Sequence, residues 1–206
     1  MAQRISNIYS LVRLPAFYEG LHALLGAQHS RARYACDILR TTPGMKVLDV
    51  GCGPATILPY LKEVTYTGVD LNEKHISHAL RTFGTRGRFV IGDATRDLAG
   101  EEDSFDLIIV SALLHHLDDD EARGLLRDLC KLAKRGARII TFDCMWLPRQ
   151  NPVAWIMIKL DSGLNVRRAE GYLALAEGLP VQIESNIYRD FLRIPYDHFC
   201  MTLTKR

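Results

Sequence analysis

The sequence predicts an α/β fold with a mostly parallel sheet and helices on both of its faces. Between about residues 45 and 145, short apolar runs alternate with segments whose apolar residues have helical spacing. The run Val47–Val50 breaks off at Gly51, Cys52 and Gly53, as a buried parallel strand does when it opens into a tight loop. At 206 residues the chain is long enough for a sizeable core, so a single domain over 1–206 is expected.

The expected elements follow in chain order. Residues 1–40 have apolar residues at helical spacing and predict a helical cover, with a second helix that starts at Ser30. The stretch Thr41–Gly44 contains Pro and Gly and ends that cover before the first strand. The core, 41–145, has five apolar runs that predict strands: 47–50, 66–69, 90–91, 105–110 and 136–142.

The helix after the fourth run is expected to begin at a capping box, since Asp118 precedes Glu121 by three residues. The acidic run 118–120 would also suit a metal site, but a capped helix start with a favourable dipole explains it better, and no metal is predicted. Gly136 is expected to end this helix. An insert over 146–180 follows, and the tail 181–206 predicts two strands, 181–192 and 198–205.

Composition argues against several classes of protein. Lys and Arg number 26 and Asp and Glu number 24, so the net charge of +2 is too mild to indicate a nucleic-acid surface. No run of 18 apolar residues occurs and the N-terminus lacks a signal-peptide pattern, so no membrane partner and a cytoplasmic location are expected. The five cysteines are widely spaced without a C-x-x-C pair, which argues against a zinc site and a disulfide framework.

The glycine loop and two carboxylates near it indicate a nucleoside cofactor. Gly51 and Gly53 let the backbone approach a ligand where a Cβ would collide, and Asp70 could accept both hydroxyls of a ribose. A dinucleotide fingerprint would place a third glycine at position 56, which is Thr. Asp49 would repel a pyrophosphate but could hold an amino group or a sulfonium. These features favour a cofactor other than NAD.

Five motifs within about residues 40 to 145 resemble those of class I S-adenosylmethionine-dependent methyltransferases of small-molecule type, as found in an uncharacterised bacterial subgroup. They are VLDVGCGPAT at 47–56, GVD at 68–70, VIGDA at 90–94, FDLIIVSALLHHL at 105–117 and GARIITF at 136–142. The resemblance implies a Rossmann-like, seven-stranded, mostly parallel sheet whose last strand is antiparallel. It also implies a helical N-terminal cover, an insert after strand five, S-adenosylmethionine as cofactor, S-adenosylhomocysteine as product and no metal.

The same resemblance implies the residues of the cofactor site, with Asp70 on the ribose and Asp93 on the adenine amino group. Cys52 is expected to fill space in the loop rather than to act as a nucleophile. The expected cofactor-binding residues are Asp49, Gly51, Cys52, Gly53, Asp70, Leu71, Gly92, Asp93, Ala94 and Ser111.

The methyl acceptor is expected above the ends of strands four and five, under the N-terminal cover and the insert. The candidate substrate-binding residues are Tyr9, Arg13, Phe17, Tyr18, Asp143, Trp146, Asn165, Arg167 and Arg168. The aromatic residues among them could equally belong to the core, and the two arginines could lie on a solvated surface instead of binding an anionic substrate. Tyr196 and His198 are expected to be structural.

His115 and His116 are the candidate catalytic residues, because an imidazole titrates close to neutral pH and suits a general base. Either could instead support the cofactor pocket or cap a helix. A dedicated base is optional, since positioning alone can supply several kcal/mol, about 7–11 in well-oriented model systems.

The predicted function is direct in-line methyl transfer to a small molecule by a monomer or homodimer, without nucleic acid. Base methyltransferases that resemble this fold have an Asn/Asp-Pro-Pro-Tyr/Phe motif after strand four or a Pro-Cys nucleophile, and the chain has Ser-Ala-Leu-Leu at 111–114. The alternative is a catalytically silent sensor or scaffold that binds S-adenosylmethionine. Two covers over the acceptor region favour catalysis, and the identity of the acceptor stays open.

Overall fold

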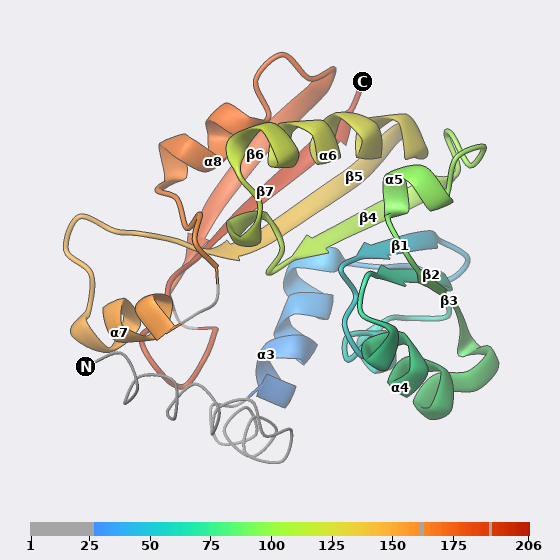
Figure 1. The fold of residues 1–206 in the computed structure, drawn as a ribbon, viewed down its shortest axis with the longest axis horizontal. Coiled ribbons are helices and arrows are strands. Elements are labelled where there is room, and N and C mark those ends of the chain that lie inside the picture. The colour runs from blue at the N-terminus through green and yellow to red at the C-terminus, as the bar shows by residue number, and fades with distance from the viewer. Residues whose placement is uncertain (1–26, 161–162, 190) are drawn as a thin grey trace.

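The computed structural model describes residues 27–160, 163–189 and 191–206. Within them, seven strands form a sheet in the order β3-β2-β1-β4-β5-β7-β6 (Figure 1). Strands β1 to β5 pair in parallel, whereas β7 runs antiparallel between β5 and β6. The strands are β1 Lys46–Val50, β2 Thr65–Asp70, β3 Gly87–Ile91, β4 Phe105–Ser111, β5 Ala133–Cys144, β6 Val181–Tyr188 and β7 His198–Lys205. The seven-stranded, mostly parallel sheet implied by the motifs is thereby confirmed.

Helices cover both faces of the sheet (Figure 1). One face carries α5 Ala94–Asp97, α6 Asp119–Leu132 and α8 Ala169–Leu175. The other face carries α3 Ala27–Arg33, its π-helical continuation η1 Tyr34–Leu39, and α4 Glu73–Phe83. Helix α7 Pro152–Leu160 lies beyond the carboxyl end of β5 (Figure 1). Short 3₁₀ turns are η2 Leu58–Tyr60, η3 Gly84–Arg86 and η4 Leu114–His116.

The central strands have continuous apolar runs because both of their faces are covered. In β4, Ile108 and Val110 join the core under α6 and α8, while Leu107 and Ile109 join the core under η1 and α4. All four are essentially inaccessible to solvent. The ends of these strands are therefore held rigidly, and the loops that follow them are the places where ligands can be bound.

Helix α6 begins as the sequence predicts and ends differently. The Glu121 N–H donates to Asp118 Oδ1 at 2.9 Å, and the Asp118 N–H donates to Glu121 Oε2 at 3.0 Å, which confirms the capping box. The prediction that Gly136 ends the helix is wrong: α6 ends at Leu132, and Gly136 lies inside β5 with φ of +78°. The pairing of β4 with β5 shifts register at this place. A positive φ serves a helix end and a bulge equally, so a glycine alone does not distinguish them.

The tail forms the two strands that were expected, and the first of them is shorter. β7 spans the predicted 198–205, but β6 ends at Tyr188 instead of residue 192. The chain turns inward after β6 because the Phe191 ring packs on Tyr188 and Phe142, with ring centroids 5.0 and 5.1 Å apart. The insert contains α7 and α8, and Met145 pairs with Arg167 through an isolated bridge. None of the described helices has the length and apolar content that a membrane span requires.

Candidate active site

The glycine loop after β1 folds back over the end of β2. The N–H groups of Gly51 and Cys52 both donate to Val69 O, at 2.8 and 3.1 Å. Gly51 and Gly53 have φ of +68° and +54°, a region that favours glycine. A Cβ on Gly51 would approach Leu113 to 3.3 Å, whereas a Cβ on Gly53 would meet nothing within 4 Å. The loop is thus packed at its first glycine and open to a ligand at its second.

Asp70 ends β2 directly beside this loop, and backbone N–H groups orient its carboxylate. Gly53 N–H donates to Oδ2 and Asn72 N–H donates to Oδ1, each at 2.8 Å. An ionised carboxylate has about four acceptor positions, so these two bonds leave capacity for the hydroxyls of a sugar. The side chain is 14% exposed, so it reaches the surface of the site.

Asp49 is a buried carboxyl group at the middle of the same edge. It is 4% exposed and accepts a hydrogen bond from the Tyr66 hydroxyl at 2.7 Å. Burial raises the pKa of Asp49 from 3.8 to about 7, and the nearby charge of Asp70 adds to the rise. A cation placed at this edge would stabilise the ionised form. Tyr66 was not singled out from the sequence, because its partner lies on the neighbouring strand.

Cys52 fills the space between the glycine loop and β2. A Cβ on Gly68 would lie 2.9 Å from Cys52 Sγ, so the absence of a side chain at Gly68 makes room for the thiol. Burial raises the pKa of Cys52, which disfavours the thiolate and hence nucleophilic chemistry. The backbone of Cys52 shapes the loop, while its side chain packs inward.

The third motif forms a short turn after β3. A Cβ on Gly92, whose φ is +154°, would lie 2.0 Å from Asp97 Oδ2, which accepts from the Asp93 N–H. Asp93 Oδ1 accepts from the backbone N–H and the hydroxyl of Thr95, which lowers the pKa of Asp93. Both of these bonds use Oδ1, and the residue is exposed, so its carboxylate can be reached by a ligand. Ala94 is buried as the first residue of α5.

Two apolar side chains are exposed at this edge. Leu71 follows β2 and is 76% exposed, and Ile91 ends β3 and is 52% exposed. Both flank the carboxylates of Asp70 and Asp93 in the chain. Exposed apolar surface beside such polar groups suits a flat, partly apolar ligand such as a purine base. Ile91 was missed in the sequence, where it looked like an ordinary strand residue.

A buried histidine and aspartate, His115 in η4 and Asp143 in β5, lie where the sequence places the acceptor. His115 Nδ1 lies 2.8 Å from Asp143 Oδ1, and the side chains are 4% and 1% exposed. The His115 backbone N–H points at the same oxygen at 3.3 Å. Within the described residues, Asp143 Oδ2 is buried without a hydrogen-bond partner. We refer to these two residues as the His115–Asp143 pair.

The segment after α7 packs directly on His115. A Cβ on Gly163 would lie 2.1 Å from His115 Cδ2, and the Asn165 N–H donates to His115 O at 2.9 Å. The His116 ring lies against the His115 ring, with centroids 4.2 Å apart. Residues Gly163 and Asn165 of the insert therefore pack on the pair. Asn165 is only partly exposed and contributes backbone to this contact.

Arg167 supports the loops rather than presenting its charge to a ligand. Nε and Nη2 bind Asp119 Oδ1 at 2.8 and 2.7 Å, and the remaining N–H groups bind the carbonyl oxygens of Leu114, Leu117 and Asn165. All five guanidinium N–H groups are thus used inside the protein. The neighbouring Arg168 is exposed. Trp146 is partly exposed, and the Lys159 ammonium lies 5.6 Å from the centroid of its ring.

Two further groups at this end were not predicted to be functional. Tyr34, in the π-helical turn η1, places its hydroxyl beside Ser111, and burial raises its pKa. π-Helical turns are frequent at functional sites. His198 stacks on Phe142 at 4.6 Å, and burial lowers the pKa of His198 to about 4, so the imidazole is neutral at physiological pH. The candidates Tyr9, Arg13, Phe17 and Tyr18 lie outside the described residues.

The described part of the chain contains no group of three or more His, Cys, Asp or Glu side chains arranged to hold a metal ion.

Comparison with known proteins finds a family match for part of the chain. Residues 47–136 match the family described as "Methyltransferase domain". The chain is 33% identical over 119 residues to phosphoethanolamine N-methyltransferase 3 of Arabidopsis thaliana, covering 55% of this chain and 24% of that protein. It is 28% identical over 152 residues to methyltransferase GfsG of Streptomyces halstedii, covering 68% of this chain and 53% of that protein. The chain thus spans a quarter to a half of the length of these relatives.

The fold also occurs in solved structures. A TehB-like SAM-dependent methyltransferase from Corynebacterium glutamicum superposes with a TM-score of 0.65 at 22% sequence identity, covering 92% of this chain and 96% of that one. This likeness shows the fold, and the matched family together with the glycine loop between two carboxylates agrees with it. Residues 47–136 thus match a methyltransferase domain, and the chain has the fold of the TehB-like SAM-dependent methyltransferase.

Proposed function

We propose that the protein transfers a methyl group from S-adenosylmethionine directly to a small-molecule acceptor, with the His115–Asp143 pair receiving the acceptor's proton. The observation that supports this most is the placement of Asp49 and Asp70 on neighbouring strands with the glycine loop between them. Two carboxylates and an open Gly53 suit a ligand that carries a cationic group and a ribose. They do not suit a pyrophosphate.

Each end of the cofactor has matching groups. Asp49 would bind its ammonium group, because a cation relieves the cost of a buried carboxylate whose pKa is raised to about 7. Asp70 would accept from the ribose hydroxyls with the positions that the backbone N–H groups leave open. Asp93 Oδ2 would accept from the adenine amino group between the exposed side chains of Leu71 and Ile91. Bound S-adenosylmethionine would supply an electrophilic methyl group on a sulfonium.

The His115–Asp143 pair gives the acceptor side a positioned base. A proton on His115 Nδ1 donates to Asp143 Oδ1, so the basic nitrogen of the neutral ring is Nε2. Gly163 packs on the ring and the Asn165 N–H binds His115 O, which holds the histidine in place and excludes water from one side. Asp143 is thus a positioning residue in this proposal, and Arg167 supports the same loops from outside.

Calorimetric titration with S-adenosylmethionine, S-adenosylhomocysteine and NAD tests the cofactor assignment. We expect micromolar binding of the first two, about 8 kcal/mol, and none of NAD. Binding of NAD alone would refute the assignment. An Asp120→Asn variant, changed at an exposed position of α6, is the matched control for Asp49→Asn and should bind as the unchanged protein does.

The role of the pair is tested with a panel of small acceptors and methyl-labelled cofactor. We expect His115→Gln to bind S-adenosylmethionine normally and to lose turnover, because the base lies on the acceptor side of the site. If no variant of the pair changes turnover, His115 is a structural residue. If cofactor binds but no acceptor in a broad panel is methylated, a silent cofactor-binding domain becomes the better description.

A further inference from the structure

Helix α7, Pro152–Leu160, is apolar apart from Lys159, yet only one side of it is buried. Ala154 and Ile158 are 0% and 2% exposed and pack against Cys144 and Tyr196, which fixes the helix to the carboxyl end of β5. In Figure 1 the helix projects beyond the arrowhead of β5, away from the main body of the sheet. Burial in the core therefore explains only half of its composition.

The opposite side of α7 exposes large apolar side chains. Val153, Trp155, Ile156 and Leu160 are 46, 49, 51 and 53% exposed. Val153, Ile156 and Leu160 are spaced three, four and seven residues apart and share one side of the helix, and Trp155 is exposed further round the helix, next to Lys159. Single exposed apolar residues need no explanation, but a contiguous group on one element marks an interaction surface. We call these four residues the α7 patch.

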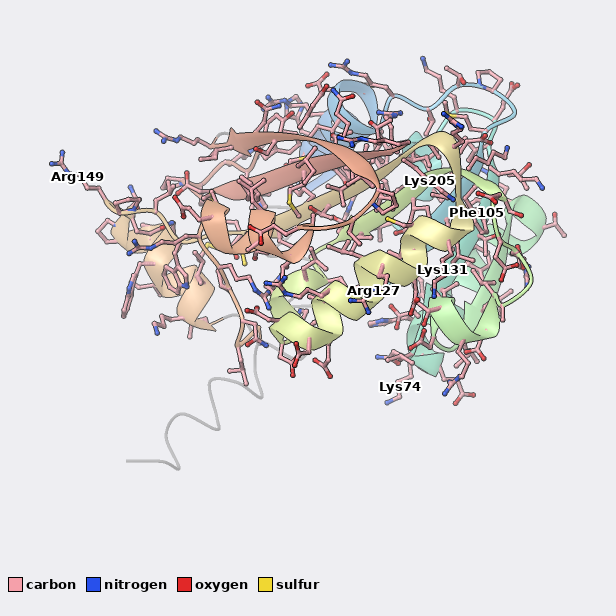
Figure 2. All side chains as sticks on the ribbon, turned by 90° about the horizontal axis from the view of Figure 1, so that it is seen from above. Lys74, Phe105, Arg127, Lys131, Arg149 and Lys205 are labelled. Carbon is pink, nitrogen blue, oxygen red and sulfur yellow. The ribbon has the colours of Figure 1, made fainter. Side chains whose placement is uncertain are left out.

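Along the chain, α7 and the residues just before it carry only positive charge. From residue 149 to 160 the sequence contains Arg149 and Lys159 and no acid, and Asp161 is the first carboxylate after them. Both cations are exposed, and the Lys159 ammonium lies 5.7 Å from the centroid of the Trp155 ring. Figure 2 shows Arg149 extending from one end of the molecule, away from Lys74 at the lower edge of the view. Exposed aliphatic side chains with a tryptophan and cations beside them are a combination found where a helix contacts a membrane interface.

We propose that the α7 patch docks on an anionic lipid bilayer. The size of the patch favours this occupant over a second copy of the chain, because a stable protein interface buries about 800 Å² per partner and a nine-residue helix side offers roughly half of that. Shallow insertion of one helix side by about 5–10 Å needs no more surface than the patch has. The sequence led us to expect no membrane partner because it lacks a spanning segment, but docking in the interface requires none.

The position of the patch connects it to the acceptor side of the site. The inner side of α7 packs on Cys144, the residue after Asp143, and the chain returns from α7 to cover His115 at Gly163. Docking through α7 therefore brings the end of the sheet that holds the His115–Asp143 pair to the bilayer surface. This docking does not depend on the proposed methyl transfer and is tested without it.

The test is co-sedimentation of the full chain with lipid vesicles of phosphatidylcholine alone or mixed with phosphatidylglycerol. We expect binding to the anionic vesicles that weakens with added salt. Ile156→Asp and Lys159→Glu should each reduce it by on the order of tenfold or more. The matched controls are Leu80→Asp and Lys74→Glu on α4, because Leu80 is 49% exposed and Lys74 is exposed, both far from α7. Both controls should bind as the unchanged protein does.

Tryptophan fluorescence gives a second readout that does not depend on a disruptive variant. The chain has two tryptophans, and quenching by lipids brominated on their acyl chains should be strong for the unchanged protein and largely lost in Trp155→Phe. Three results would overturn the proposal. The first is no binding of the unchanged protein to anionic vesicles, and the second is an equal loss of binding in the α4 controls. The third is a melting temperature of Ile156→Asp, measured in the absence of vesicles, that lies below that of the unchanged protein. The last would mean that another part of the chain covers the patch. Calorimetry of S-adenosylmethionine binding is read separately, so failure of docking and failure of the proposed function are distinguishable.

Discussion

Replacing Asp49 by Asn should make the protein more stable at neutral pH and weaken its binding of the cofactor. Asn keeps an oxygen that can accept from the Tyr66 hydroxyl, now 2.7 Å from the carboxylate, but it has no charge to bury. The structure places Asp49 at 4% exposure with its pKa raised from 3.8 to about 7. Burial therefore destabilises the ionised form of Asp49 when no cation is nearby.

The pKa shift sets the size and the pH range of the effect. Between pH 3.8 and about 7 the folded state holds a proton that the unfolded state has released, so the free energy of unfolding falls as the pH rises. A shift of this size corresponds to about 4 kcal/mol above pH 7, of which more than half is lost between about pH 5 and 8. The advantage of Asp49→Asn over the unchanged protein should grow by that amount over the same range.

The assay is urea unfolding of both proteins at a series of pH values from about 5 to 8, analysed as the difference between them. The difference is needed because other groups titrate in this range, including His198, whose pKa is lowered to about 4 by burial and which acts in the opposite direction. Saturating S-adenosylmethionine should reduce the difference at high pH, since its cationic group would pair with the carboxylate.

Two results would refute this reasoning. A stability difference that does not change with pH would mean that Asp49 is not a buried acid with a raised pKa. If Asp49→Asn binds the cofactor as tightly as the unchanged protein does at pH 8, Asp49 does not contact the cofactor. For the unchanged protein, affinity should fall by up to about tenfold per pH unit below pH 7, because binding then requires release of a proton.

Three further variants test the acceptor side of the site. His115→Ala should lower the free energy of unfolding by about 3–5 kcal/mol in urea, because it leaves the Asp143 carboxylate, 1% exposed, without its imidazole partner; a loss below 1 kcal/mol would contradict the buried pair. Gly163→Ala should lower the free energy of unfolding by about 1–3 kcal/mol, since the added Cβ would lie 2.1 Å from His115 Cδ2. Gly124→Ala inside α6, where a Cβ would meet nothing within 4 Å, should raise it by about 0.5–1 kcal/mol. Arg167→Lys should speed amide hydrogen exchange in η4, because a single ammonium replaces five N–H groups that bind Asp119 and three carbonyl oxygens; unchanged exchange would show that the loops do not depend on the guanidinium.

Much of the fold could be predicted from local patterns. The parallel strands follow from apolar runs, which in β1, β2, β4 and β5 are largely buried, and β7 begins and ends where the tail pattern placed it. The capping box of α6 depends on residues three apart, so the sequence contains all of it. Gly136 shows the limit of such reasoning, because its positive φ belongs to a register shift against β4 rather than to a helix end.

The candidate site, like the fold, could be predicted from the sequence only in part. The order of motifs along the chain placed the glycine loop, Asp49 and Asp70 together, because the carboxyl ends of neighbouring parallel strands share one edge of a sheet. The partners of Arg167 could not be inferred, since they come from a loop about 50 residues away in the sequence. An arginine beside a predicted acceptor site suggested an anionic substrate until its hydrogen bonds were seen.

The sequence by itself determined the backbone chemistry of the cofactor edge: where a glycine must turn, which strands end there and which carboxylates follow them. These features depend on conformational preferences of a few consecutive residues. Only the tertiary structure decided that His115 meets Asp143 28 residues later, that Tyr66 donates to Asp49, and that α7 turns an apolar side to solvent. Such contacts depend on how distant segments pack and on which surfaces remain uncovered when packing is complete, and no local pattern in the chain records that.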